Sequence, residues 1–152
     1  MKVLPRLLTL SLLVFNAGVN ADTPASDKAV DMVVYRSPSC TCCGKWLEHI
    51  KSNNFNVKDI VTDDVQTIKN KFGVTAEMAS CHTAIVNGYV IEGHVPANDI
   101  KKLLKTKPKL AGIAVPGMPK GTPGMEMGGV KDAYNVMSFN KDNQYEVFSS
   151  YQ

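Results

Sequence analysis

The stretch VDMVVYRSPSCTCCGKW, residues 30–46, places a strand, a turn and the start of a helix in succession. Residues 30–36 have the β-branched and aromatic content of a strand, and Ser37-Pro38-Ser39 ends it. From Cys43 to about Asn53 apolar residues recur at helical spacing. The three cysteines of Cys40-Thr41-Cys42-Cys43 therefore lie at the junction between a strand and a helix.

The rest of the chain continues this pattern. Phe55 to Val61 predicts a second strand, and Thr62-Asp63-Asp64 a cap for a short helix that Gly73 ends. Asn87-Gly88 is the strongest hairpin signal in the chain. It separates predicted strands over 83–86 and 89–95, after which Pro96 opens a third helix with a lysine-rich outer side, and a closing hairpin is predicted over 134–139 and 145–150. The order β-α-β, α, β-β-α predicts an α/β, thioredoxin-like fold.

The first 21 residues have the pattern of a secretory signal peptide. Lys2 and Arg6 flank an apolar run, Leu7 to Phe15, that is too short to span a bilayer, and Val19-Asn20-Ala21 offers small residues for cleavage before Asp22. We therefore expect an exported protein.

After cleavage we expect a polar leader over residues 22–29 and one domain over residues 30–152, with no membrane attachment. The chain has 152 residues, 44% of them hydrophobic and 20% charged, which is an ordinary globular balance. Loss of Lys2 and Arg6 lowers the net charge from +3 by two, to +1. That near-neutral charge gives no electrostatic basis for binding nucleic acid.

Export makes structural disulfides the first interpretation of the four cysteines. A bond between Cys42 and Cys43 is disfavoured, because neighbouring α-carbons lie ~3.8 Å apart and disulfides usually need roughly 4.4 to 6.8 Å. The least strained pairing joins Cys40 to Cys43 and Cys42 to Cys81. However, cross-links among three cysteines in four residues close almost no loop and stabilise little, which favours a chemical role.

In a thioredoxin-like fold the cysteines occupy the reactive end of the domain. Cys40 and Cys43 have C-x-x-C spacing at a helix N-terminus, where the partial positive charge stabilises thiolates. Cys81 comes immediately before the third strand, at the position where thioredoxins place a proline beside the active cysteines. We therefore expect Cys81 to approach the other three. A dithiol oxidoreductase needs only two thiols, whereas metal binding uses all four.

A segment rich in Gly and Pro, residues 110–130, contains six of the eleven glycines and three prolines. Such a segment supplies no regular apolar face, so its methionines, Met118, Met125 and Met127, are candidate ligands rather than core residues. Thioethers bind copper(I) and have little affinity for zinc. Thiolates together with thioethers predict copper.

The histidines carry less information. His49 lies among apolar residues of the first helix, and we interpret it as structural. His82 adjoins Cys81, but alternation along a strand would point the two side chains in opposite directions. His94 is either a hydrogen-bonded structural residue or the mark of a second copper position, because imidazole suits copper(II). Both alternatives stay open for His82 and His94.

Three motifs together resemble the CopG-like family, exported copper-resistance proteins of Gram-negative bacteria. They are YRSPSCTCCGKW (35–46), SCHTAIVNGYVIEGHVP (80–96) and VPGMPKGTPGME (115–126). The resemblance implies a thioredoxin-like fold, a periplasmic location, and a multicopper centre bridged by cysteines, with a part in interconverting Cu(I) and Cu(II). It also implies copper ions as partners, with a periplasmic protein that donates or accepts them.

Geometry supports the same hypothesis. Neighbouring Cys42 and Cys43 do not easily point at one tetrahedral ion, which argues against a closed zinc site, whereas bridging sulfurs serve several copper(I) ions. Turnover between oxidation states would need a harder ligand, for which His94 or His82 is the candidate. Two other classes remain open, a thiol-disulfide oxidoreductase that uses Cys40 and Cys43, and a disulfide-stapled interaction domain.

Overall fold

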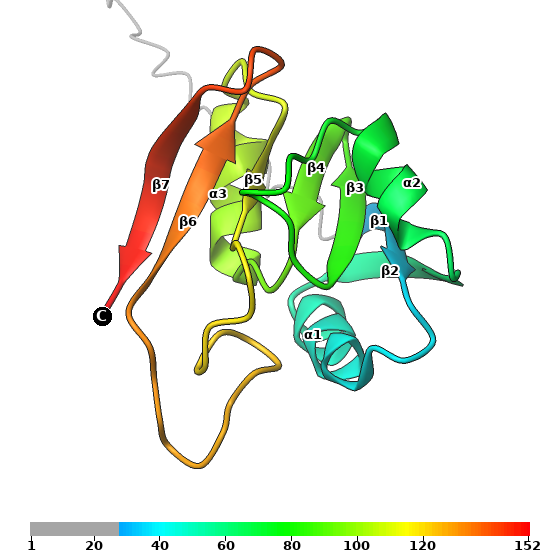
Figure 1. Cartoon of the computed structure of the whole chain (residues 1–152), viewed down its shortest axis with the longest axis vertical. Coiled ribbons are helices and arrows are strands. Elements are labelled where there is room, and N and C mark those ends of the chain that lie inside the picture. Colours follow the sequence, from blue (N-terminus) through cyan, green and yellow to red (C-terminus); the bar gives the residue numbers. More distant parts are fainter. Residues whose placement is uncertain (1–27) are drawn as a thin grey trace, which may run out of the picture.

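The computed structural model describes residues 28–152, which form one seven-stranded mixed sheet and three helices (Figure 1). The expected signal peptide and most of the polar leader lie outside the described residues. The elements, in chain order, are β1 (Val30–Arg36), α1 (Thr41–Ser52), β2 (Phe55–Val61), α2 (Val65–Lys71), β3 (His82–Val86), β4 (Tyr89–Glu92), α3 (Ala97–Thr106), β5 (Gly112–Ala114), β6 (Tyr134–Phe139) and β7 (Tyr145–Tyr151).

The sheet has the order β2-β1-β3-β4-β5-β6-β7. β1 pairs with β2 in parallel, while β3 pairs with β1 and β4 in antiparallel fashion. This confirms the predicted parallel pair, antiparallel hairpin and thioredoxin-like order. Asn87 and Gly88 both have positive φ, at 46° and 83°, as a two-residue hairpin turn requires.

Helices cover both faces of the sheet. On one face α1 and α3 pack over the main core, where Trp46, Ile50, Ile100 and Leu103 are fully buried. On the other face α2 and the chain that follows it cover a smaller core around Val74 and Phe139. The predicted outer lysines of α3 are exposed.

Several predicted boundaries were wrong. The strand predicted to reach Val95 ends at Glu92, because Gly93 has a φ of +73° and turns the chain. A short strand, β5, lies inside the segment that we expected to be loop, and it pairs in parallel with β4. Asp64 occupies the N-cap of α2 but makes no side-chain capping bond; instead Thr62 Oγ1 accepts a hydrogen bond from the Asp64 amide.

The segment between β5 and β6, residues 115–133, forms a long loop that returns beside α1 (Figure 1). The loop approaches α1 closely at Gly124, where an added Cβ would lie 2.7 Å from the Trp46 amide nitrogen. Only a glycine, at a φ of +85°, fits there. The loop is therefore held against the cysteine-bearing end of the helix. Within the described residues no helix has the length and apolar composition needed to cross a bilayer.

Candidate metal centre

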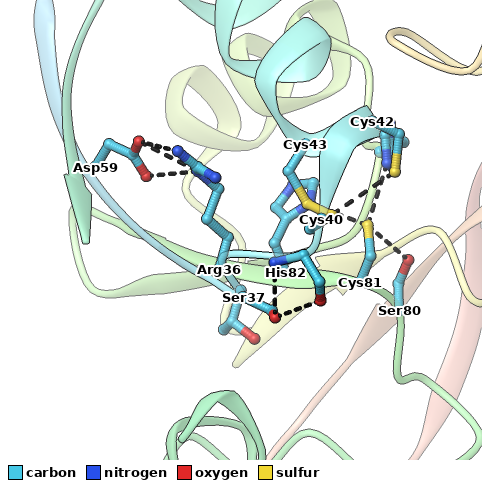
Figure 2. The surroundings of a disulfide bond; sticks show 12 residues. Arg36, Ser37, Cys40, Cys42, Cys43, Asp59, Ser80, Cys81 and His82 are labelled. Atoms are coloured by element: carbon cyan, nitrogen blue, oxygen red, sulfur yellow. Dashed lines mark hydrogen bonds and ion pairs between the residues drawn. A yellow bond between two sulfur atoms is a disulfide. The ribbon is translucent and has the colours of Figure 1, made fainter. Parts of the chain in front are cut away.

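The four cysteines meet at one end of the sheet, as expected. Cys40 is the N-cap residue of α1, Cys42 and Cys43 lie in its first turn, and Cys81 comes directly before β3. One Sγ atom from each lies within 4.8 Å of the others. Figure 2 shows the Cys42 and Cys81 side chains beside the bond between Cys40 and Cys43.

Two of the cysteines are joined and two are free. Cys40 and Cys43 form a disulfide with their α-carbons 5.5 Å apart, and Cys42 Sγ lies 3.7 Å from Cys40 Sγ. The pairing of Cys40 with Cys43 that we considered is therefore present, while Cys42 and Cys81 are thiols. This arrangement keeps two thiols in reach of a C-x-x-C disulfide.

Burial sets the protonation of Cys81. Desolvation, followed by the negative charge of a Cys42 thiolate, raises the pKa of Cys81 to about 12. At neutral pH the metal-free protein therefore holds Cys81 as a neutral thiol, which is a weak nucleophile. A bound cation would compensate the charge of the thiolate and reverse this preference.

The structure brings both candidate histidines to Cys81. His94 Nε2 lies 3.1 Å and His82 Nδ1 3.2 Å from Cys81 Sγ, and all three side chains form a second group of donor atoms within 4.8 Å. Of the two alternatives left open for His82, the side chain lies beside Cys81: strand alternation does not separate them, because Cys81 lies in the bend before β3 and not within it.

His94 presents a lone pair to the cluster. Its Nδ1 donates a hydrogen bond to the Pro123 carbonyl oxygen at 2.7 Å, which places the proton on Nδ1 and leaves Nε2 free to accept or ligate. Burial lowers the pKa of His94 and keeps the ring neutral. The carbonyl also ties His94 to the methionine-bearing loop.

His82 is fully buried against Trp46, with ring centroids 4.2 Å apart. Desolvation, followed by the proximity of His94, lowers its pKa well below the usual value. Its Nε2 has no hydrogen-bond partner among the described residues, which is uncommon for a buried polar atom. His49, by contrast, has a structural role as expected, since its Nε2 accepts a hydrogen bond from the Ala97 amide at the start of α3.

The three candidate methionines lie at different places relative to the cysteines. Met125 and Met127 line a hollow of about 360 Å³ together with Cys42 and Lys45. Met118 is 55% exposed and is not among the residues that line this hollow. It follows Gly117, whose carbonyl accepts a hydrogen bond from Ser80 Oγ, next to Cys81. The loop thus places two methionines beside Cys42, whereas Met118 follows the residue that bonds to Ser80.

Sequence reasoning missed a buried ion pair beneath the site. Lys69 and Glu92 are 5% and 0% exposed and are joined at 2.5 Å. Desolvation raises the pKa of Glu92, while Lys69 and the hydrogen bonds from Thr83 and Ser80 act in the opposite direction. The signal was present in α2, where Lys69 occupies the i+4 position from buried Val65 on the inward face.

The fold and this site define a thioredoxin-like protein whose reactive end carries a cysteine cluster with the donor chemistry of a soft-metal site. Residues 78–125 match the family described as a protein of unknown function, DUF411. No match was found among curated proteins.

Two solved structures are similar to the chain over most of its length. One is copper resistance protein CopG in form 2, with 42% sequence identity, a TM-score of 0.79, and coverage of 82% of this chain and 100% of that chain. The same protein in form 1 has 44% identity and a TM-score of 0.77, covering 82% of this chain and 98% of that one. The chain belongs to the CopG family of copper resistance proteins.

Proposed function

We propose that the reduced chain binds several copper(I) ions through the thiolates of Cys40, Cys42, Cys43 and Cys81. The observation that carries this proposal is the meeting of four Sγ atoms within 4.8 Å of one another. Thiolates are soft ligands that suit copper(I). The adjacent positions of Cys42 and Cys43 favour sulfurs that bridge several ions over a closed tetrahedral site.

Neutral imidazoles and thioethers complete the proposed centre. His94 Nε2 and His82 Nδ1 lie beside Cys81 Sγ, and both imidazoles would suit copper(II). Met125 and Met127 lie beside Cys42, where thioethers would favour copper(I). Met118 is proposed as a further ligand from the same loop. The cluster would thus have soft thioether sulfurs on one side and harder imidazole nitrogens on the other. Such a donor set supports the proposal that the protein interconverts Cu(I) and Cu(II).

The Cys40–Cys43 disulfide supports a redox role. Oxidation of the two thiolates to this disulfide releases two electrons, which reduce two Cu(II) ions to two Cu(I) ions. The Cys40–Cys43 disulfide would be the oxidised product of that step. We place this activity in the periplasm of a Gram-negative bacterium, where copper is exchanged with a donor or acceptor protein, on the basis of the signal-like N-terminus.

A copper(I) titration of the reduced protein under anaerobic conditions tests the proposal. We expect saturation above one equivalent per chain and little displacement by zinc. Cys81→Ser should lower the stoichiometry, because a serine hydroxyl is a hard and weakly acidic substitute for a thiolate. Saturation at one equivalent, or a preference for zinc, would contradict the multinuclear centre.

A thiol-disulfide oxidoreductase is the second candidate, favoured by the C-x-x-C disulfide at the start of α1. In that case Cys40 and Cys43 suffice, and Cys81→Ser leaves the reduction of insulin nearly unchanged. Two results together would make dithiol exchange the main function instead of copper chemistry. The wild type would show strong reductase activity that Cys40→Ser abolishes, and Cys81→Ser would still bind copper in full.

A further inference from the structure

The buried ion pair between Lys69 and Glu92 lies directly beneath the segment that carries Cys81. Lys69 Nζ bonds to Glu92 Oε1 at 2.5 Å and donates to Thr83 Oγ1 at 3.1 Å. Thr83 Oγ1 in turn donates to Glu92 Oε2 at 2.6 Å. Burying two charges is costly, and apolar side chains of similar volume often stabilise a core as well. Stability alone is therefore a weak reason for the pair.

The carboxylate of Glu92 has a second contact, which points toward the metal centre. Its Oε1 accepts a hydrogen bond from the Ser80 amide at 2.7 Å. Ser80 immediately precedes Cys81, and this bond joins the end of β4 to the segment just before β3. A hydrogen bond to an ionised acceptor is stronger than one between neutral groups, so Glu92 fixes the backbone one residue from the thiol.

The opposite side of the same segment is also fixed. Ser80 Oγ donates to the Gly117 carbonyl, and the Gly117 amide donates to the Ala79 carbonyl at 3.1 Å. At Gly93 the packing is so close that a Cβ would lie 2.5 Å from Ser80 Cβ and 2.7 Å from the Val115 carbonyl oxygen. The residues before Cys81 are thus enclosed between the ion pair and the methionine-bearing loop.

We propose that Glu92, with its charge compensated by Lys69, is a positioning residue that holds the Ser80–Cys81 backbone so that Cys81 Sγ faces both histidines and the other cysteines. Glu92 acts through the backbone and does not itself ligate, because its oxygens bond to Lys69, Thr83 and Ser80. The consequence for copper rests on the proposed function, but the positioning of the thiol is measurable without metal.

Two double variants test the hydrogen bond to Ser80. Lys69→Met with Glu92→Gln removes both charges and keeps an oxygen for the Ser80 amide. Lys69→Met with Glu92→Leu removes both charges and that oxygen. Because both are neutral, neither leaves an uncompensated buried charge. They differ in the polar group that accepts the hydrogen bond from the Ser80 amide and that also pairs with the Thr83 hydroxyl.

The first measurement is alkylation of the metal-free oxidised protein by iodoacetamide, with each thiol quantified by peptide mass spectrometry. Cys42 is the internal control. We expect Cys81 to be alkylated about tenfold faster in the Leu variant than in the Gln variant. This is the factor by which the loss of one hydrogen bond should increase the population in which the segment is open. Cys42 should react equally in both. A rate that does not change in low urea shows that global unfolding is not the route.

The second measurement is copper(I) stoichiometry of the reduced variants, where the Gln variant should match the wild type and the Leu variant should bind less. If the wild type binds no copper, the proposed function fails while alkylation still decides the positioning role. Equal Cys81 rates in both double variants would overturn the proposal.

If a double variant does not fold, Thr83→Val and Thr83→Ser replace them, since only Ser retains the hydroxyl that holds Glu92. We expect faster Cys81 alkylation in the Val variant alone, and equal rates in the two would likewise overturn the proposal.

Discussion

The contact between Gly124 and α1 allows a direct test of whether the methionine-bearing loop serves the cysteine cluster. Gly124→Ala would place a methyl group 2.7 Å from the Trp46 amide nitrogen and 3.1 Å from its Cα, at a φ of +85°. A left-handed alanine costs about 1–2 kcal/mol, and overpacking typically adds about 1–3 kcal/mol. The substitution should therefore destabilise the metal-free protein by about 2–5 kcal/mol.

Gly128→Ala is the matched control. Gly128 lies in the same loop at a φ of +58°, but nothing lies within 4 Å of the place that a Cβ would take there, so only the backbone cost of about 1–2 kcal/mol applies. Urea unfolding of the reduced, metal-free proteins gives both free energies, and competition with a chromophoric chelator gives copper(I) affinity. We expect only Gly124→Ala to lose affinity, because the loop that brings Met125 to Cys42 must lift. Equal stability and equal affinity in the two variants would refute this reasoning.

Three other outcomes are expected. Replacing Met125 and Met127 by Leu should lower copper(I) affinity without changing the stability of the metal-free protein much, whereas buried Met78→Leu, on the opposite face of the sheet, should leave affinity unchanged. The fluorescence of Trp46, the only tryptophan, should fall as copper fills the adjacent site and should not fall with redox-inactive zinc; quenching by neither or by both metals would contradict this placement. Because burial lowers the pKa of His82, its stabilising contribution is full above the unfolded pKa of about 6.5 and is lost as pH falls from there toward the folded pKa. The unfolding free energy should therefore drop by up to about 1.4 kcal/mol per pH unit, because the unfolded state takes up this proton. In urea titrations between pH 7 and 5, His82→Phe should reduce the dependence of the unfolding free energy on pH; an unchanged dependence would exclude His82 as its source.

Local signals sufficed for most of the fold because each acts over a few residues. The strands at 30–36 and 55–61 were predicted with their observed bounds, since β-branched runs between turn residues specify both ends. β5 was missed because three residues with a glycine carry no recognisable strand pattern, and its pairing with β4 is a long-range effect. β4 ends at Glu92 because the chain turns at Gly93, and the close approach of Ser80 and Val115 leaves no space there for a side chain.

The candidate site shows the same division between local and long-range information. The spacing of Cys40, Cys42 and Cys43 at a helix start is visible in the chain, and the fold class then predicts that Cys81 joins them. What the sequence leaves open is which neighbours face Cys81, because that depends on one bend before β3 and on the hydrogen bonds that fix it. Glu92, the last residue of β4, accepts a hydrogen bond from the Ser80 amide, directly before Cys81. The motif around Glu92 and His94 therefore supplies both a support for the thiol and an imidazole that faces it. Glu92 is fully buried and Lys69 compensates its charge there, so a lysine lies on the inward face of α2, where the helical pattern alone predicts an apolar residue.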